Sequence, residues 1–166
     1  MDSRALLEVL AVDVGGIRCG FLAADVIAVH RAARPVVLPG APGAVEGMLN
    51  VHGEVVVLVD LRRRLGLESR PLRAAHHVVV LRGSGRQLGV RVERAEQMVA
   101  LTVDDVREVP PQAGAPARGV ARLCSGLLLI FEPDRFLTAD ETDVLDAALA
   151  EVDGAGAALV GGSTRA

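Results

Sequence analysis

Side chains that could perform chemistry are few in this sequence, and their spacing does not assemble a site. His76 and His77 are adjacent, and because neighbouring residues of a strand point to opposite faces, they cannot chelate one metal ion together. Cys19 and Cys124 form no pair with metal-ligand spacing. His52 has no nucleophile or orienting carboxylate in its local sequence. We therefore predict no catalytic residue, no metal site and no cofactor.

Two short motifs could be mistaken for ligand-binding sequences. Gly83-Ser84-Gly85 lacks the following Lys-Ser/Thr and the helix of a phosphate loop, so it predicts a hairpin turn. The run Arg62-Arg63-Arg64 could contact nucleic acid, but three basic residues after a strand are more typical of a solvated helical turn. The two cysteines are predicted to be small core residues of the fold.

The composition describes a globular protein with a valine- and leucine-rich core. Of the 166 residues, 51% are hydrophobic, three are Phe and none is Tyr or Trp. The lack of stacking aromatics and the net charge of −3 both disfavour nucleic-acid binding. No apolar run is long enough to cross a membrane, and the N-terminus does not read as a secretory signal. We therefore expect a cytoplasmic protein with reduced thiols.

The positions of these residues depend on a stretch that occurs twice in the chain. Residues 47–65, GMLNVHGEVVVLVDLRRRL, align without gaps on residues 119–137, GVARLCSGLLLIFEPDRFL, at an offset of 72 residues. Gly20 and Gly89 recur at the similar offset of 69 residues. A spacing near seventy residues is too long for solenoid repeats. It indicates two copies of one small β unit.

Apolar and alternating runs predict strands separated by turn signals. Val55–Val59 is an uninterrupted run rich in β-branched residues, typical of a strand buried on both faces. Gly15-Gly16 is a two-residue hairpin signal, and Pro110–Pro116 predicts a loop. The predicted strands are 6–14, 17–22, 26–31, 45–50, 54–59, 77–81, 87–92, 97–103, 120–123 and 127–131.

These strands predict an all-β fold of two five-stranded antiparallel barrels packed together, plus a C-terminal α-helix. We expect the first barrel at residues 1–67, with contributions from the C-terminal helix, and the second at 76–137. The helix is predicted at 138–153, with its apolar face docked on the barrels. Gly154 is predicted to end it, and residues 154–166 read as a flexible tail.

A linked set of residues carries a family resemblance over about residues 6–152. In the first half the set comprises Leu38-Pro39-Gly40-Ala41-Pro42, Val45, Gly47, Asn50, Gly53, Val57, Val59-Asp60-Leu61 and Leu65-Gly66. In the second half it comprises Gly89, Val99–Val106, Gly119-Val120-Ala121 and Leu127–Phe131. This set resembles the CheW-like domain of bacterial chemotaxis. The resemblance implies two intertwined SH3-like barrels and a non-enzymatic adaptor that couples chemoreceptors to the histidine kinase CheA.

The chain departs from the family at two positions. Family members usually carry Asn-Leu-Arg-Gly where this chain has Asn50-Val51-His52-Gly53, and often a Glu where it has Ala28. The resemblance implies that this Glu and this Arg face each other at the partner-binding surface. Because losing both charges can be nearly neutral, we expect Ala28 and His52 to form a weaker or altered docking surface. The predicted partner-binding residues are Val26, Ala28, Val29, Gly47, Asn50, His52 and Gly53.

The resemblance also implies the partners. They are the cytoplasmic tip of a methyl-accepting chemoreceptor, received in an apolar groove between the barrels, and the regulatory domain of a CheA-type kinase. Neither nucleic acid nor direct membrane insertion is expected. The alternatives are a divergent protein that binds receptors without engaging the kinase, an SH3-like nucleic-acid-binding module and a small hydrolase. For Gly47 and Gly53 a purely geometric role at bends is weighed equally with partner contact.

Overall fold

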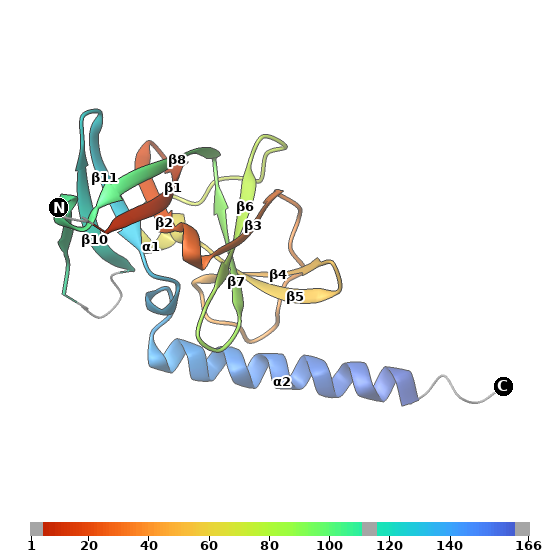
Figure 1. The fold of residues 1–166 in the computed structure, drawn as a ribbon. Coiled ribbons are helices and arrows are strands. Elements are labelled where there is room, and N and C mark those ends of the chain that lie inside the picture. Colours follow the sequence, from red (N-terminus) through yellow and green to blue (C-terminus); the bar gives the residue numbers. More distant parts are fainter. Residues whose placement is uncertain (1–4, 111–115, 162–166) are drawn as a thin grey trace.

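The computed structural model describes residues 5–110 and 116–161, which form two β-sheets and one long C-terminal helix (Figure 1). The first half contains β1 (Leu6–Val14), β2 (Ile17–Leu22), η1 (Ala23–Asp25), β3 (Val26–Arg31), β4 (Val45–Val51), β5 (Glu54–Val59) and α1 (Leu61–Arg64). The second half contains β6 (His77–Arg82), β7 (Gln87–Val92), β8 (Arg94–Thr102), η2 (Val103–Asp105), β9 (Val106–Glu108), β10 (Ala117–Leu123), β11 (Gly126–Phe131), η3 (Pro133–Arg135) and α2 (Ala139–Gly161). The mostly-β fold with a C-terminal helix is confirmed.

Each sheet combines strands from both halves of the chain. Sheet A has the order β8-β1-β2-β11-β10-β9, and sheet B has the order β3-β6-β7-β5-β4. Four pairs join the halves: the parallel pairs β2–β11 and β5–β7 and the antiparallel pairs β1–β8 and β3–β6. The remaining pairs are antiparallel and lie within one half. The predicted division at 1–67 and 76–137 is therefore not the division between the sheets. Each leading hairpin, β1–β2 or β6–β7, pairs with the later strands of the other half.

The strand predictions differ from the structure mainly in sheet A. Strand β8 begins at Arg94 rather than at residue 97, and the short strand β9 was not predicted. With β9, sheet A has six strands instead of five. Among the described residues the strand order is open at both ends of each sheet, so the sheets are curved rather than closed barrels. Of the predicted loop Pro110–Pro116, residues 111–115 lie outside the described residues.

The two sheets share one hydrophobic core. Its largest members are Phe21 of β2, Phe131 of β11 and Phe136 before α2, whose ring centroids lie 6.0 to 6.2 Å apart. Valines of both sheets complete this cluster, among them Val12 and Val90. Smaller apolar clusters lie within sheet A and within sheet B. Because either small sheet would be marginal alone, the shared core makes the two sheets one folding unit.

The internal duplication is preserved in the pairing of the strands. Gly47 in β4 lies opposite Leu58, and Gly119 in β10 lies opposite Ile130, each just after a register shift. Leu58 then lies opposite Gly89 of β7, as Ile130 lies opposite Gly20 of β2. The four positions therefore repeat at the offsets seen in the sequence. A side chain at Gly20 or Gly89 would collide with neighbouring valines, which explains a glycine there.

The arginine run forms helix α1 as predicted, but it is not simply a solvated turn. Arg62 is buried and forms an ion pair with Glu93. Arg64 forms an ion pair with Glu141 of α2, while Arg63 donates a hydrogen bond to a backbone carbonyl. The predicted solvation is correct for Arg63, which is exposed. It is wrong for Arg62 and Arg64, because their guanidinium groups find acceptors on Glu93, which follows β7, and on α2. Its basic charge is largely used within the protein.

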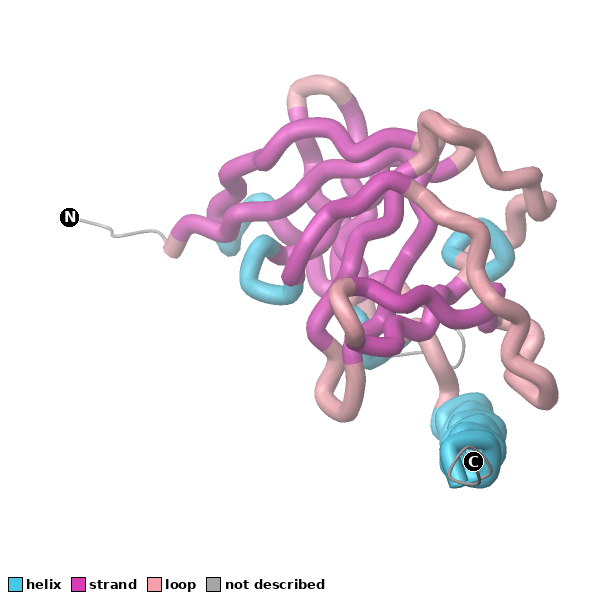
Figure 2. The backbone as a smooth tube through the Cα atoms, turned by 90° about the vertical axis from the view of Figure 1, so that its right-hand side faces the viewer, coloured by secondary structure: helices cyan, strands magenta, loops and turns pink. Residues whose placement is uncertain are grey.

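Helix α2 begins at a capping box and docks by its first turns. The Glu141 N–H donates to the Thr138 hydroxyl at 3.2 Å, and the Thr138 N–H donates to the Glu141 carboxylate at 2.8 Å. Leu145 and Ala148 are buried in the shared core, which confirms docking of the apolar face there. Figure 2 views the helix nearly end-on, outside the strands.

The far end of α2 differs from the prediction. The helix continues past Gly154 to Gly161, so the predicted helix boundary at residue 153 is wrong. A glycine weakens a helix by about 1 kcal/mol relative to alanine but ends it only when its backbone turns left-handed. Gly154 does not have a positive φ. Of the predicted tail 154–166, residues 162–166 lie outside the described residues.

Candidate partner-binding site

All seven predicted partner-binding residues lie on β3, β4 and the β4–β5 turn of sheet B. Strands β3 and β4 are the two outer strands of this sheet. The sheet is curved so strongly that His30 of β3 and His52 of the turn are in contact, with ring centroids 5.6 Å apart. Residues 22 positions apart in the chain and at opposite edges of one sheet therefore meet at one place.

The β4–β5 turn holds His52 in an unusual backbone conformation. His52 and Gly53 form the two-residue connection between Val51 and Glu54, with φ values of 52° and 86°. Positive φ at both positions is the pattern of a type I′ hairpin turn. The Asn50 side-chain oxygen accepts a hydrogen bond from the Gly53 N–H at 2.8 Å. Asn50, His52 and Gly53 are exposed, and the turn presents them to solvent.

Strand β3 divides the predicted residues between its two faces. Val26 and Ala28 are half-buried, and Ala28 packs against the small cluster inside sheet B. Val29 points the other way and is 40% exposed. His30 lies on the same face as Ala28, one alternation closer to the turn. The sequence analysis placed Ala28 opposite His52, but it is His30 that the structure places against the His52 ring.

Gly47 has a structural reason to be glycine. It is buried, its φ is 152°, and a Cβ there would lie 2.4 Å from the backbone oxygen of Val36. Val36 forms a β-bridge to Met48 next to this contact. Gly53 differs because a Cβ would meet no atom within 4 Å. The geometric interpretation therefore explains Gly47 fully, whereas Gly53 is needed only for its turn conformation.

A small cavity of about 220 Å³ lies where β3 meets the β4–β5 turn. Its polar lining comes from His30, Arg31, Asn50 and His52, and no acidic residue lines it. The His30 Nε2 atom is buried and has no hydrogen-bond partner. The residues that line the cavity therefore supply basic and neutral hydrogen-bond donors, and one of them, His30, has a ring nitrogen without a hydrogen-bond partner.

An apolar groove of about 360 Å³ lies between sheet B and helix α2. Val55 and Val57 of β5 and Met48 of β4 line one side, and Leu149 and Val152 of α2 line the other. Val55 is 60% exposed, so the predicted burial of the whole 55–59 run fails at its first residue. A groove of this kind suits an apolar helix face.

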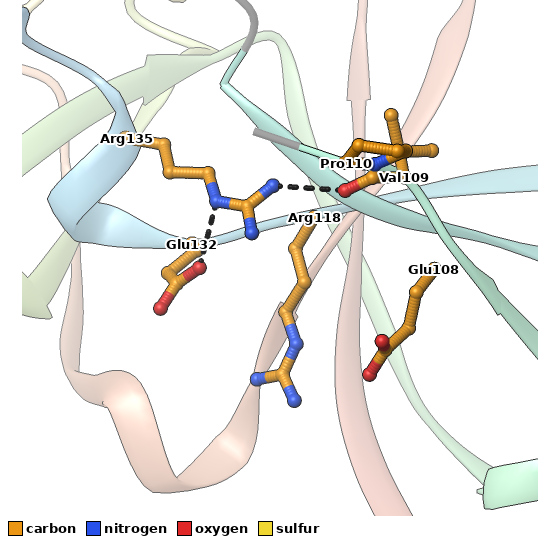
Figure 3. A pocket seen from close by; sticks show the side chains of 6 residues that line it. All are labelled: Glu108, Val109, Pro110, Arg118, Glu132 and Arg135. Atoms are coloured by element: carbon orange, nitrogen blue, oxygen red, sulfur yellow. Dashed lines mark hydrogen bonds and ion pairs between the residues drawn. The ribbon is translucent and has the colours of Figure 1, made fainter. Parts of the chain in front are cut away.

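A third cavity, of about 400 Å³, is lined by charged residues at the start of η3 (Figure 3). Arg135 forms an ion pair with Glu132 at 2.9 Å and donates a hydrogen bond to the Val109 carbonyl at 3.1 Å. The Arg118 side chain projects between those of Glu132 and Glu108. Charges of both signs alternate here, so this cavity does not select an ion of one sign.

The described residues contain no group of three metal ligands. The Ser84 N–H donates a hydrogen bond to the Asp134 carboxylate at 2.8 Å. In a phosphate loop the corresponding backbone N–H would bind a phosphate, so here the protein's own carboxylate takes that place. Burial, together with the charge of Asp13, raises the pKa of the Cys19 thiol to about 12, so this thiol is unreactive. Cys124, predicted to be a core residue, is instead exposed beside the β10–β11 turn. None of the helices among the described residues is long and apolar enough to span a membrane.

The comparisons with known proteins match this architecture. The CheW-like domain family matches residues 8–141. A chemotaxis protein CheW of Treponema pallidum is 25% identical over 83% of this chain and 81% of its own length. A chemotaxis protein CheW of Rhizobium meliloti is 26% identical over 64% of this chain and 71% of its own length.

Among solved structures, the scaffolding protein TtCheW from Thermoanaerobacter tengcongensis superimposes with a TM-score of 0.74. The match covers 82% of this chain and 96% of that one at 17% identity, and it shows a shared fold. The family consists of non-enzymatic scaffold proteins with two SH3-like subdomains, and its match extends over both sheets described above. The chain belongs to the CheW-like family.

Proposed function

We propose that this protein is an adaptor that couples chemoreceptors to a CheA-type histidine kinase in a bacterial chemosensory complex. The observation that carries the proposal is the match of the CheW-like family to residues 8–141, through both sheets and up to the start of α2. The chain's relatives are named chemotaxis proteins, and the similar solved structure is named a scaffolding protein, which supports a scaffolding role in chemotaxis. This role requires a cytoplasmic location beside the receptor array.

Two surfaces of sheet B fit the two partners. The apolar groove between β5 and α2 would receive the helical cytoplasmic tip of a chemoreceptor, by packing of a helix into a groove. The outer strand β3 and the β4–β5 turn would contact the regulatory domain of the kinase. Val26, Ala28 and Val29 supply the strand, and Asn50 and His52 supply the turn. Each contact is small, so strength would come from many copies in an array.

The proposal is tested by measuring binding to each partner separately. Purified full-length chain is titrated with a receptor cytoplasmic fragment and, in a second experiment, with the kinase regulatory domain. We expect micromolar binding to both. Binding to the receptor alone would support the alternative of a protein that does not engage the kinase, and binding to neither would contradict the adaptor role. Binding to oligonucleotides that falls with salt would support the nucleic-acid alternative.

A matched pair of variants assigns the receptor surface. Val55→Asp places a charge in the apolar groove and should weaken receptor binding at least about tenfold. Leu127→Asp is the control, because Leu127 is the equivalent residue of the second copy and is equally exposed, at 61% against 60%. It lies on sheet A, away from the groove. Equal effects of the two variants on receptor binding would refute the assignment.

A further inference from the structure

One residue that lines the cavity between β3 and the β4–β5 turn has a buried polar atom without a partner. His30 Nε2 is buried and forms no hydrogen bond, although a buried polar atom without one costs about 1–3 kcal/mol. The ring beside it belongs to His52, which is exposed and anchored only through its turn.

The charges around this cavity favour an anion. His30 and Arg31 come from β3, and His52 comes from the turn, so the ionisable side chains in the lining are all basic. His77 lies opposite Arg31 on β6, and one of its ring nitrogens is also buried without a partner. Glu54, which follows the turn, is exposed and does not line the cavity. Basic side chains therefore still outnumber acidic ones when His77 and Glu54 are counted with the lining of the cavity.

We propose that this cavity accepts a carboxylate side chain, from an Asp or Glu of the docking protein, between the imidazoles of His30 and His52. The inference rests on the proposed adaptor function and takes the kinase regulatory domain as the partner. The carboxylate displaces the His52 ring and accepts hydrogen bonds from both imidazoles. At about 220 Å³ the cavity is large enough for one such side chain and too small for a helix. The two imidazoles thus supply hydrogen-bond donors for the carboxylate.

The cavity is tested without any partner by titrating the full-length protein with acetate at constant ionic strength. Imidazole nitrogen resonances of His30 and His52 should shift together and saturate in the millimolar range. His77 is the control, because it is a histidine with a buried unpartnered nitrogen that does not line the cavity. Absence of a saturable shift, or the same shift at His77, would overturn the proposal.

The role in docking is tested with the kinase regulatory domain. His30→Gln and His52→Asn should each weaken binding about tenfold, because a charge-assisted hydrogen bond is lost. Asn is chosen at residue 52 because it tolerates the positive φ of the turn. His77→Gln should leave affinity unchanged, and thermal unfolding checks that each variant is folded. Wild-type affinity of both His30→Gln and His52→Asn would overturn the proposal. If the wild-type chain does not bind the kinase at all, the adaptor proposal fails, and the acetate titration alone decides whether the cavity binds carboxylates.

Discussion

Replacing Gly47 by alanine should destabilise the protein far more than a surface glycine replacement. Gly47 has a φ of 152°, a conformation that costs a residue with a side chain about 1–3 kcal/mol. The added Cβ would lie 2.4 Å from the Val36 backbone oxygen, so one of the two segments must move. Val36 and Met48 exchange two backbone hydrogen bonds of 2.8 Å, and losing both costs about 1–3 kcal/mol more.

These two contributions add to a loss of about 4 kcal/mol in the free energy of unfolding for Gly47→Ala. Replacements of two other glycines distinguish the contribution of the backbone φ from that of the contact with Val36. Gly53→Ala shares the positive φ but meets no atom within 4 Å, so it should cost about 1 kcal/mol. Gly119→Ala, at the equivalent position of the second copy, does not have a left-handed φ. Its Cβ would lie 2.9 Å from a Val106 methyl group, which can move aside, and 3.1 Å from the Arg107 backbone oxygen, a milder contact than the 2.4 Å at Gly47.

Urea unfolding followed by far-ultraviolet circular dichroism measures these differences, since the chain has no Tyr or Trp to report by fluorescence. The expected order of destabilisation is Gly47→Ala well above Gly119→Ala and Gly53→Ala. The reasoning fails if Gly47→Ala lies within about 1 kcal/mol of Gly53→Ala, because the contact with Val36 would then contribute nothing. It also fails if Gly47→Ala and Gly119→Ala cost the same.

Three further perturbations test other contacts. Although burial acts in the opposite direction, hydrogen bonds at the start of α2 lower the pKa of Glu141, so acid titration should destabilise the wild type more than Glu141→Gln below about pH 4.5. A thiol reagent should label Cys124 in the folded protein and Cys19 only after unfolding. Arg91→Met leaves the Glu46 carboxylate unpaired and should cost about 3 kcal/mol in urea unfolding, most of which Glu46→Gln should restore.

Local features of the fold were predictable because they depend on neighbouring residues. The apolar runs at residues 54–59 and 87–92 and the Gly15-Gly16 turn each specify an element by themselves. The exchange of hairpins between the halves was not visible in the strand pattern, because that pattern gives strands without their partners. Only the family resemblance suggested that the two barrels were intertwined. Strand β9, three residues long, gives no periodic signal at all.

The candidate site was predictable only in part. The resemblance indicated β3 and the β4–β5 turn, which the structure brings into contact, and identified His52 as a departure from the family pattern. His30 was missed because its contact with His52 depends on the curvature of sheet B, which brings the two outer strands together. Alternation along β3 could have suggested it, since residues 28 and 30 share a face. Whether Ala28 or His30 contacts the β4–β5 turn depends on how β3 is positioned relative to β4, which the sequence does not reveal.

The duplication by itself would give the protein two equivalent faces, and helix α2 makes them different. Val55 and Leu127 are equivalent in the two copies and equally exposed. Beside Val55, α2 contributes Leu149 and Val152 and completes an apolar groove. The cavity beside Leu127 is lined instead largely by charged side chains of η2, β9 and β10. Because a single helix follows two β units, one copy gains an apolar groove and the other keeps a polar surface, so the repeat presents two chemically different faces.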